Sequence, residues 1–299
     1  MRVLITGASG RVGRALYVRL MREHEVTGLD RAPSSTADLV GDITDAKLLE
    51  RAAQGMDAIV HVAALHAPHV DRVPEAVFER INVGGTQRVL QAAQKCGVPH
   101  IVFTSTTALY GTGSAREGEA AWLTEDTPPA PRTVYHRTKI DAEQLLLHAA
   151  RSGGPRVSVL RMSRCFPEPA PLMALYRLHR GIDARDVAEA HARALHKPPA
   201  TSRLCVVSAA TPFEPEDAEG LMRDAPAVLR QRAPALVQTF AARGWPLPAA
   251  IDRVYVPRRA EAELGWRSRH GFEAVLKQLD EESSEVLPPK MSDLAGAAT

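Results

Sequence analysis

The chain has 299 residues, of which 45% are hydrophobic and 24% charged, the balance of a folded globular protein. The 37 lysines and arginines against 35 acidic residues give a net charge of +2, without the concentrated basic face of a nucleic-acid-binding protein. No apolar stretch approaches the roughly 18 residues of a membrane-spanning helix. Val3-Leu4-Ile5, directly after Met1-Arg2, is typical of a strand, so we expect no signal peptide and a cytoplasmic protein.

Short apolar runs alternate with longer helical stretches in the first half of the chain. The pattern predicts strands near residues 3–5, 25–29, 39–40, 58–62, 101–103 and 157–160, and helices near 11–23, 45–54, 74–96 and 134–150. Strands separated by helices imply right-handed crossovers and a parallel sheet with helices on both faces. The predicted fold class is therefore α/β, a Rossmann-type doubly wound parallel sheet.

The second half is interrupted by prolines and carries fewer clear elements. A helix at 186–195, a strand at 204–207 and a closing helix at 272–279 are predicted. We expect 1–165 to form the dinucleotide-binding region, completed by about 182–208. Residues 166–181 and 209–285 are expected to form a small substrate-binding cap at the C-terminal side, and 286–299 a flexible tail. The three scattered cysteines, Cys96, Cys165 and Cys205, predict reduced thiols rather than a disulfide framework.

Three glycines, Gly7, Gly10 and Gly13, follow the first strand and open the next helix. Glycines allow a tight turn and close approach to a pyrophosphate, which then lies at the positive end of the helix. The alternative is a glycine-rich turn without a ligand. Asp30 ends the second predicted strand, where a carboxylate can bind both ribose hydroxyls and repel a 2′-phosphate. This favours NAD over NADP, although Arg31 next to it could soften the repulsion and Asp30 could be a turn carboxylate only.

The GxxGxxG spacing resembles that of the extended short-chain dehydrogenases/reductases, the NAD-dependent epimerase/dehydratase family. Further stretches match in order: Gly41-Asp42-Ile43, His61-Val62-Ala63-Ala64, Asn82 in the long helix, Ile182–Ala188 and Leu264-Gly265-Trp266. The resemblance implies a cofactor site that includes Gly7, Ser9, Gly10, Arg11, Val12, Gly13, Asp30, Arg31, Asp42, Ile43, Val62, Ala63, Ala64, Asn82, Thr104, Tyr135 and Lys139.

Tyr135 and Lys139 form the YxxxK pattern of that family, and a separation of four positions places both on one helical face. A phenol with a pKa near 10 is a poor base. We expect the ammonium, together with the positive nicotinamide ring, to lower that pKa so that Tyr135 takes a proton from a substrate hydroxyl. Resemblance to the Ser/Thr stretch before Tyr-Gly indicates Thr106 as the third catalytic member, with Ser105 as the alternative one position earlier.

Substrate contacts are expected from residues beyond the catalytic ones. They are His66, Thr106, Thr107, Arg164 and Arg177. A guanidinium suits bidentate pairing with a carboxylate, although both arginines could make surface ion pairs only. His61, His66 and His69 lack the company of metal ligands, and we expect no metal site.

Two functions remain in competition, with a non-catalytic NAD-binding protein a third possibility. The first is an NAD-dependent oxidoreductase that removes a hydride from a secondary alcohol of a sugar or sugar acid. The second is a nucleotide-sugar 4-epimerase or dehydratase in which NAD is recycled within one turnover. Arg164 replaces the asparagine of sugar-nucleotide members, and the short segment after it resembles that of uronate dehydrogenases, so we expect no UDP-sugar substrate. The resemblance also implies a homodimer built from the 74–96 and 134–150 helices.

Overall fold

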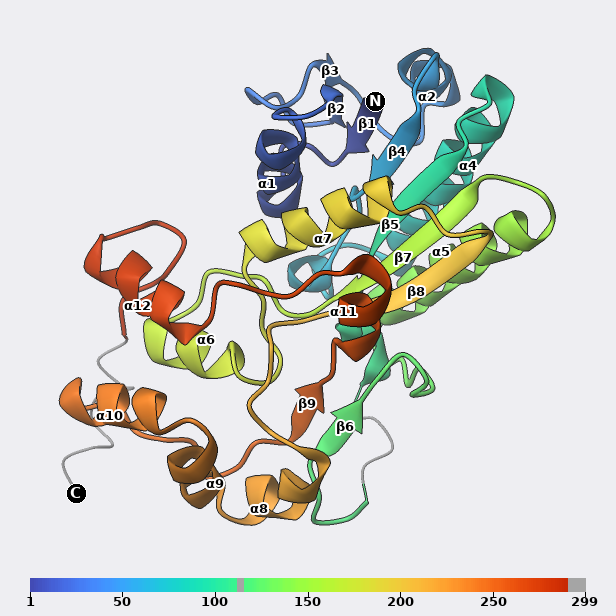
Figure 1. Cartoon of the computed structure of the whole chain (residues 1–299). Coiled ribbons are helices and arrows are strands. Elements are labelled where there is room, and N and C mark those ends of the chain that lie inside the picture. Colours follow the sequence, from blue (N-terminus) through green and yellow to red (C-terminus); the bar gives the residue numbers. More distant parts are fainter. Residues whose placement is uncertain (112–115, 290–299) are drawn as a thin grey trace.

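A seven-stranded parallel sheet forms the centre of the molecule, in the order β3-β2-β1-β4-β5-β7-β8 (Figure 1). The computed structural model describes residues 1–111 and 116–289. The strands are β1 (Arg2–Thr6), β2 (Glu25–Asp30), β3 (Leu39–Val40), β4 (Ala58–His61), β5 (His100–Thr106), β7 (Arg156–Met162) and β8 (Ser202–Val207). The chain reverses its direction of winding between β1 and β4, the place where open α/β sheets bind ligands. The predicted fold class is confirmed.

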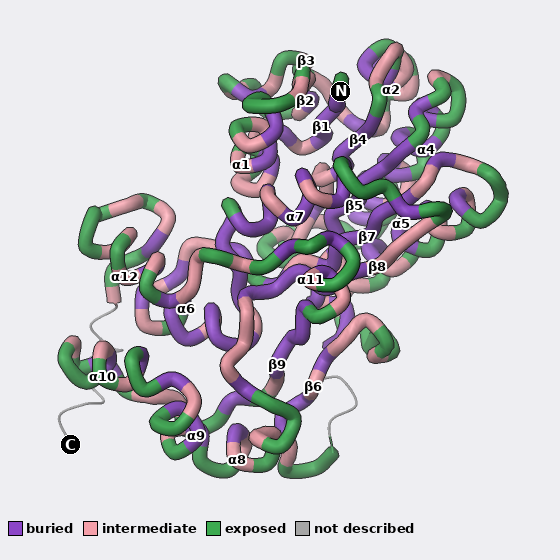
Figure 2. Tube along the Cα trace, in the orientation of Figure 1, coloured by how far each residue is buried: buried purple, intermediate pink, exposed green. Residues whose placement is uncertain are grey.

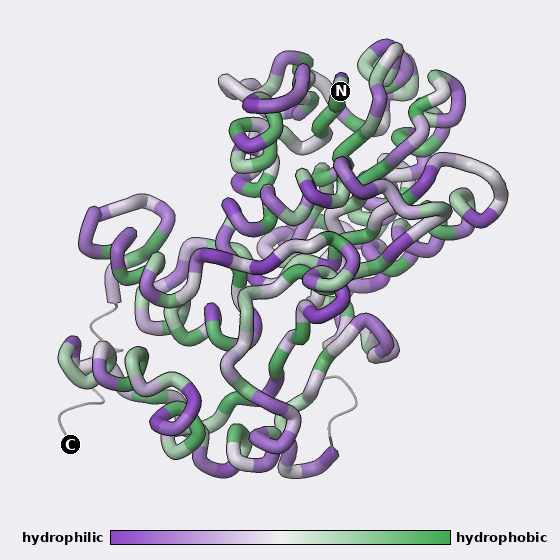
Figure 3. The backbone as a smooth tube through the Cα atoms, in the orientation of Figure 1, coloured by the Kyte–Doolittle hydropathy of each residue, from purple (hydrophilic) through white to green (hydrophobic). Residues whose placement is uncertain are grey.

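Helices cover both faces of the sheet. One face packs against α1 (Arg11–Leu20), α7 (Ala184–His196) and α11 (Arg258–Leu264). The other packs against α2 (Ala46–Ala53), α4 (Gly85–Cys96) and α5 (Val134–Arg151). Because the strands are covered on both sides, their sequences are continuous apolar runs, and β1 and β4 are buried along almost their whole length (Figure 2). In Figure 3 the same strands are mostly green, the colour of hydrophobic residues.

The long helix expected at 74–96 is divided into three pieces. It runs as α3 (Glu75–Phe78), a π-helical turn η2 (Glu79–Gly84) and α4. Such turns are frequent near functional sites because they change which side chains face inward. Here the turn buries Asn82, whose amide bonds to the backbone N–H and carbonyl of Leu65 at 2.8 and 3.0 Å and to the Thr138 hydroxyl at 3.0 Å.

A smaller unit lies beyond the carboxyl ends of the strands (Figure 1). It contains a two-stranded parallel sheet, β6 (Ala121–Leu123) with β9 (Arg253–Tyr255). Its helices are α6 (Ala170–Tyr176), α8 (Ala218–Arg223), α9 (Ala225–Arg232), α10 (Pro234–Ala242) and α12 (Phe272–Asp280). Three 3₁₀ turns occur in the connecting segments: η1 (Ala67–His69), η3 (Thr107–Tyr110) and η4 (Pro215–Asp217). This cap has its own core, which includes Phe213, Phe240 and Trp245. Among the described helices, none is long and apolar enough to cross a membrane.

The segment after α12 is anchored before the described chain ends at 289. Val286 is buried in the cap core, and Leu287 exchanges backbone hydrogen bonds with Glu168 and Ala170 at 3.0 and 2.9 Å. The first two residues of the tail that was predicted to be flexible, Val286 and Leu287, therefore pack against the cap. The rest of that prediction, residues 290–299, lies outside the described residues.

Candidate functional site

One cavity of about 960 Å³ extends along the carboxyl ends of the strands, from the glycine turn after β1 to the cap. Its wall contains nearly all the residues predicted for the site. They are Gly7, Ser9, Gly10, Arg11, Val12, Gly13, Asp30, Arg31, Asp42, Ile43, Val62, Ala63, Ala64, His66, Thr104, Ser105, Thr106, Thr107, Tyr135, Lys139 and Arg164. Two predicted residues, Asn82 and Arg177, are not part of this wall.

The glycine turn is shaped to leave room for a ligand. Gly7 has φ +78°, and a Cβ on Gly13 would lie 2.0 Å from the Gly7 carbonyl oxygen, so both positions require glycine. Gly10 caps the N-terminus of α1, and within the described chain no side chain caps this end and no acidic residue lies in its first turn. The free N–H groups and the helix dipole therefore fit an anion such as the pyrophosphate of a dinucleotide.

Asp30 lies at the end of β2 with its carboxylate fixed by the backbone. The Ser9 N–H donates to Oδ2 and the Ala32 N–H donates to Oδ1, both at 2.9 Å. Each carboxylate oxygen keeps a lone pair for a further donor such as a ribose hydroxyl. Asp42 instead accepts from the Thr44 N–H and hydroxyl at 2.8 Å, which closes the turn before α2 while leaving Asp42 in the cavity wall.

Tyr135 and Thr106 lie close together in the wall of the cavity. Tyr135 lies in the first turn of α5, and burial raises the pKa of its phenol to about 12. The nearby Thr106 hydroxyl, at the last residue of β5, acts in the opposite direction on that pKa. The loss of solvent around the phenol dominates its pKa, and the expected lowering by the lysine together with the nicotinamide ring stays a prediction.

Lys139 lies one helical turn further along α5 and is almost fully buried. Its Nζ donates to the Thr104 carbonyl oxygen at 2.7 Å and stands 3.9 Å from the centre of the Phe103 ring. Burial lowers the pKa of Lys139 to about 7, with the nearby carboxylate of Glu143 acting in the opposite direction. The lysine is thus held in a fixed position in the cavity wall by the end of β5.

Ser105 differs from Thr106 in that its hydroxyl belongs to a buried ionic network that the sequence did not reveal. Ser105 donates its hydroxyl hydrogen to Glu143, which also accepts from Arg161 at 2.6 and 3.0 Å. Arg161 donates in turn to the Tyr110 hydroxyl at 2.9 Å. The spacing of Tyr135, Lys139 and Glu143, four residues apart in each step, places all three on one face of α5 and could have indicated this network.

The cap end of the cavity is rich in arginine. Arg164 pairs with Glu168 at 2.6 Å, and its guanidinium lies 5.3 Å from the Phe166 ring, which also stacks on His66 at 5.7 Å. Further arginines that line this end were not predicted from the sequence: Arg132, Arg180 and Arg253. Their side chains come from three separate segments, so only the fold brings them together.

The prediction that Arg177 contacts substrate is wrong. Its side chain is 1% exposed and pairs with Asp183 at 3.2 Å, within the joint between cap and sheet. Asn82 likewise braces the loop after β4 through Leu65 instead of reaching the cavity. The sequence shows that both residues are polar. It does not show how the π-helical turn orients Asn82 or how the end of α6 orients Arg177.

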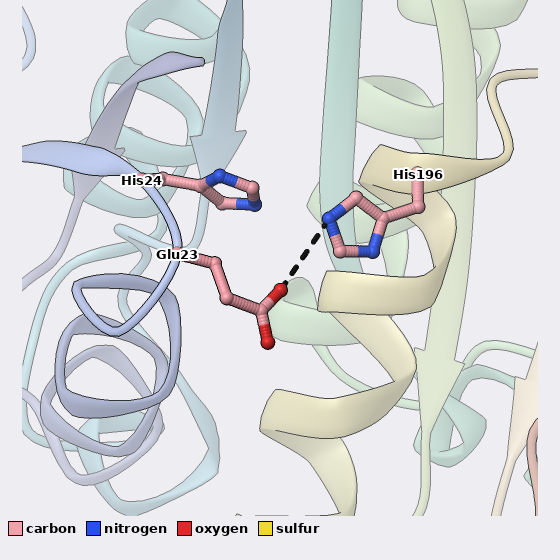
Figure 4. A group of neighbouring side chains, drawn as sticks. All are labelled: Glu23, His24 and His196. Atoms are coloured by element: carbon pink, nitrogen blue, oxygen red, sulfur yellow. Dashed lines mark ion pairs between the residues drawn. The ribbon is translucent and has the colours of Figure 1, made fainter.

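In the part of the chain that the structure describes, the histidines near the cavity do not belong to a group of possible metal ligands, and the expectation of no metal site stays a prediction. His61 is buried between the hydroxyls of Thr6 and Thr86, and burial lowers its pKa to about 3. The described residues contain one group of possible ligands elsewhere, Glu23, His24 and His196, between the ends of α1 and α7 (Figure 4). These three residues do not line the cavity.

Comparison with known proteins agrees with this geometry. The model of the family described as "NAD dependent epimerase/dehydratase family" matches residues 3–169. An N-acetyl-alpha-D-glucosaminyl-diphospho-ditrans,octacis-undecaprenol 4-epimerase from Escherichia coli O157:H7 is 34% identical over 147 residues, 48% of this chain and 42% of that protein. An L-arabinose 1-dehydrogenase (NAD(P)(+)) from Haloferax volcanii is 32% identical over 170 residues, 54% of this chain and 66% of that protein.

The alignments with both curated relatives thus span less than two thirds of those proteins' own length. The structure of a Thermus thermophilus UDP-glucose 4-epimerase in complex with NAD has a TM-score of 0.68 at 25% identity, covering 94% of this chain and 98% of that one. The family is NAD-dependent, in agreement with the predicted cofactor. The chain belongs to the NAD-dependent epimerase/dehydratase family.

Proposed function

We propose that this chain is an NAD-dependent dehydrogenase that oxidises a secondary alcohol of a sugar or sugar acid. The observation that carries the proposal is the proximity of Thr106 to Tyr135, which line the same cavity as Lys139 and the glycine turn. Hydride transfer from an alcohol needs an acid–base group close to both the cofactor and the substrate. Tyr135 would have this position between the glycine turn and the cap.

The residues present fit NAD. The N–H groups at the start of α1 would hold the pyrophosphate, and the Asp30 carboxylate would hold the ribose hydroxyls of the adenosine. Asp42 and Ile43 would border the adenine, and Lys139 would reach the other ribose. When bound, NAD supplies the acceptor for a hydride.

The chain's own residues would handle the proton. A substrate hydroxyl placed beside Thr106 and Tyr135 can accept a hydrogen bond from the former and give its proton to the phenolate of the latter. The carbon–hydrogen electron pair leaves as the hydride while the carbon–oxygen double bond forms, so charge and electrons balance. A phenol with its pKa at about 12 needs help to ionise, and we expect that help from a Lys139 ammonium on the same helical face together with the positively charged nicotinamide ring of bound NAD.

An anionic substrate is supported by the charges of the cap end. Among the described residues of the wall, the carboxylates are Asp30, Asp42 and Glu285, whereas arginines 132, 164, 180 and 253 line the opposite part. Outside the wall, Glu168 pairs with Arg164, and Asp252 pairs with both Arg180 and Arg253, so these charges are partly neutralised. Guanidinium groups pair bidentately with carboxylates, so a sugar acid fits this end better than a neutral sugar.

The second candidate is a nucleotide-sugar 4-epimerase or dehydratase that recycles NAD. The 34% identity to an undecaprenyl-diphospho-sugar 4-epimerase favours it. Against it, the segment after Arg164 is short and contains the seven-residue helix α6, whereas the resemblance implies a longer substrate-binding segment there in nucleotide-sugar members. We also propose a homodimer through the α4 and α5 side of the molecule, where Leu145 and Leu147 are partly buried, and a cytoplasmic location.

The substrate class can be tested by ligand-induced stabilisation. With NAD present, uronic and aldonic acids should raise the unfolding temperature, whereas the matching neutral sugars should not. Arg164→Met should remove that shift, and Arg22→Met, an exposed change on the α1 side, should not. Stabilisation by UDP-glucose or UDP-galactose with micromolar affinity, and none by sugar acids, would favour the second candidate.

A further inference from the structure

Arg11 carries two hydrogen-bond donors without a partner at the wall of the cavity. Its Nε and Nη1 are shielded from solvent and bond to nothing within the described chain. It is the first residue of α1, directly after Gly10 of the glycine turn, and it lines the cavity. A shielded guanidinium donor left unpaired is costly, so two such donors beside an anion cradle indicate an acceptor that a ligand supplies.

The third nitrogen of Arg11 is held by a carboxylate from the segment that follows α12. Its Nη2 pairs with Glu285 Oε2 at 2.6 Å, and Glu285 itself lines the cavity. The pairing restrains the guanidinium, because its Nη2 is bound to a carboxylate. The other two nitrogens, Nε and Nη1, therefore keep a defined orientation. The side chain of Arg11 is 17% exposed, so solvent screens this pair only in part.

Glu285 is in turn fixed by its neighbours in the chain. On one side, the Ser283 N–H bonds to the Gln278 carbonyl of α12 at 2.9 Å. On the other, Val286 is buried in the cap core and Leu287 pairs with the segment before α6. The ion pair therefore connects the segment after α12, which is packed on the cap, with the glycine turn. Arg11 and Glu285 are 274 residues apart in the sequence.

We propose that Arg11 binds the pyrophosphate of NAD through Nε and Nη1, and that Glu285 is the positioning residue that holds Arg11 for this contact. The segment between α12 and residue 287 is then part of the cofactor site rather than a surface extension. The inference rests on the proposed binding of NAD in this cavity. It adds a side-chain cation to the backbone N–H groups of α1 as a determinant of cofactor affinity.

The test is the dissociation constant of the purified chain for NAD, ADP-ribose and adenosine by isothermal titration. Arg11→Met should weaken the binding of NAD and ADP-ribose by about tenfold or more, the usual loss for a hydrogen bond to a charged group. The affinity for adenosine should not change. Arg11→Lys keeps the charge and a partner for Glu285 but loses the fork, and should also weaken both pyrophosphate ligands. Unfolding midpoints without ligand confirm that each variant is folded.

Glu285 is tested through its dependence on Arg11. Glu285→Gln should weaken the binding of NAD and ADP-ribose severalfold in the native chain and should have no further effect in the Arg11→Met variant. Glu282→Gln, a change at an exposed neighbouring residue, should not affect binding in either background. Unchanged affinity in folded Arg11→Met and Arg11→Lys, or an equal loss from Glu285→Gln in both backgrounds, would overturn the inference. A native chain that binds none of the three ligands would overturn the proposed function itself.

Discussion

The hydroxyl of Thr106, at the last residue of β5, lies beside the phenol of Tyr135 in the first turn of α5 and acts to lower the pKa of that phenol, which burial raises. Side chains of successive strand residues point to opposite sides. Ser105 consequently points away and donates to Glu143 inside the sheet–helix interface. The two neighbouring hydroxyls are therefore expected to have different roles, and their substitution separates catalysis from stability.

Thr106→Ala should lower kcat by about 10²-fold or more, since it removes the hydroxyl that orients the substrate oxygen toward Tyr135. Ser105→Ala should instead lower the free energy of unfolding by about 1–3 kcal/mol, because Glu143 loses a donor in a buried site. Steady-state rates and urea unfolding of both variants measure this. A larger loss of kcat from Ser105→Ala than from Thr106→Ala would show that the assignment is one residue out.

Tyr135→Phe should reduce turnover by about 10²–10⁴-fold, the range of general acid–base contributions. Its NAD dissociation constant should stay within about threefold, because the glycine turn and Asp30 do not involve the phenol. The measurement combines initial rates with isothermal titration of NAD. A variant with near-native turnover would remove Tyr135 from the mechanism.

Cofactor choice should follow Asp30. We expect the native chain to bind NAD at least tenfold more tightly than NADP, because the fixed carboxylate repels a 2′-phosphate. Asp30→Asn should tighten NADP binding, and Arg31→Met should weaken NADP without affecting NAD. Titration of both cofactors against the three proteins gives the answer. If the native chain binds NADP as tightly as NAD, Arg31 rather than Asp30 governs the pocket.

Much of this site could be predicted from local sequence, and the rest depended on packing. Gly7 and Tyr135 lie in motifs whose function follows from spacing within one turn or helix, so their place in the cavity was predictable. Arg177 and Arg253 illustrate the limit. Arg177 is outside the cavity wall because its side chain is buried against Asp183, and Arg253 is in the wall because of the parallel pairing of β6 with β9. Neither the π-helical turn around Asn82 nor the return of Glu285 to Arg11 has a short-range signal.

The stability of the fold should fall in acid because of buried histidines. Burial lowers the pKa of His61 to about 3 and of His100, His179 and His191 to about 4. The unfolded chain protonates these groups below its ordinary pKa near 6.5, whereas the folded chain does so only near 4 or below. Stability present above 6.5 is therefore lost as the pH falls, by on the order of 1–2 kcal/mol per histidine between pH 7 and 5.

Urea unfolding at pH 7.5 and 5.0 measures this loss. His191→Gln, which keeps hydrogen-bonding groups toward Thr104 and Val187, should have a smaller difference between the two pH values than the native chain. His148→Gln, a change at the outer end of α5, serves as the control and should leave the difference as it is. Equal free energies of unfolding at both pH values would contradict the assignment of neutral buried histidines.

The most direct test of the central claim is the stoichiometry of NADH and product. A uronic or aldonic acid that stabilises the NAD-bound chain is incubated with excess NAD, and NADH absorbance is compared with the keto or lactone product. The account predicts one NADH released per product, a deuterium label on the oxidised carbon transferred to NADH, and loss of both in Tyr135→Phe. Turnover of a nucleotide sugar to an epimer or dehydrated product, with no NADH released, would contradict it.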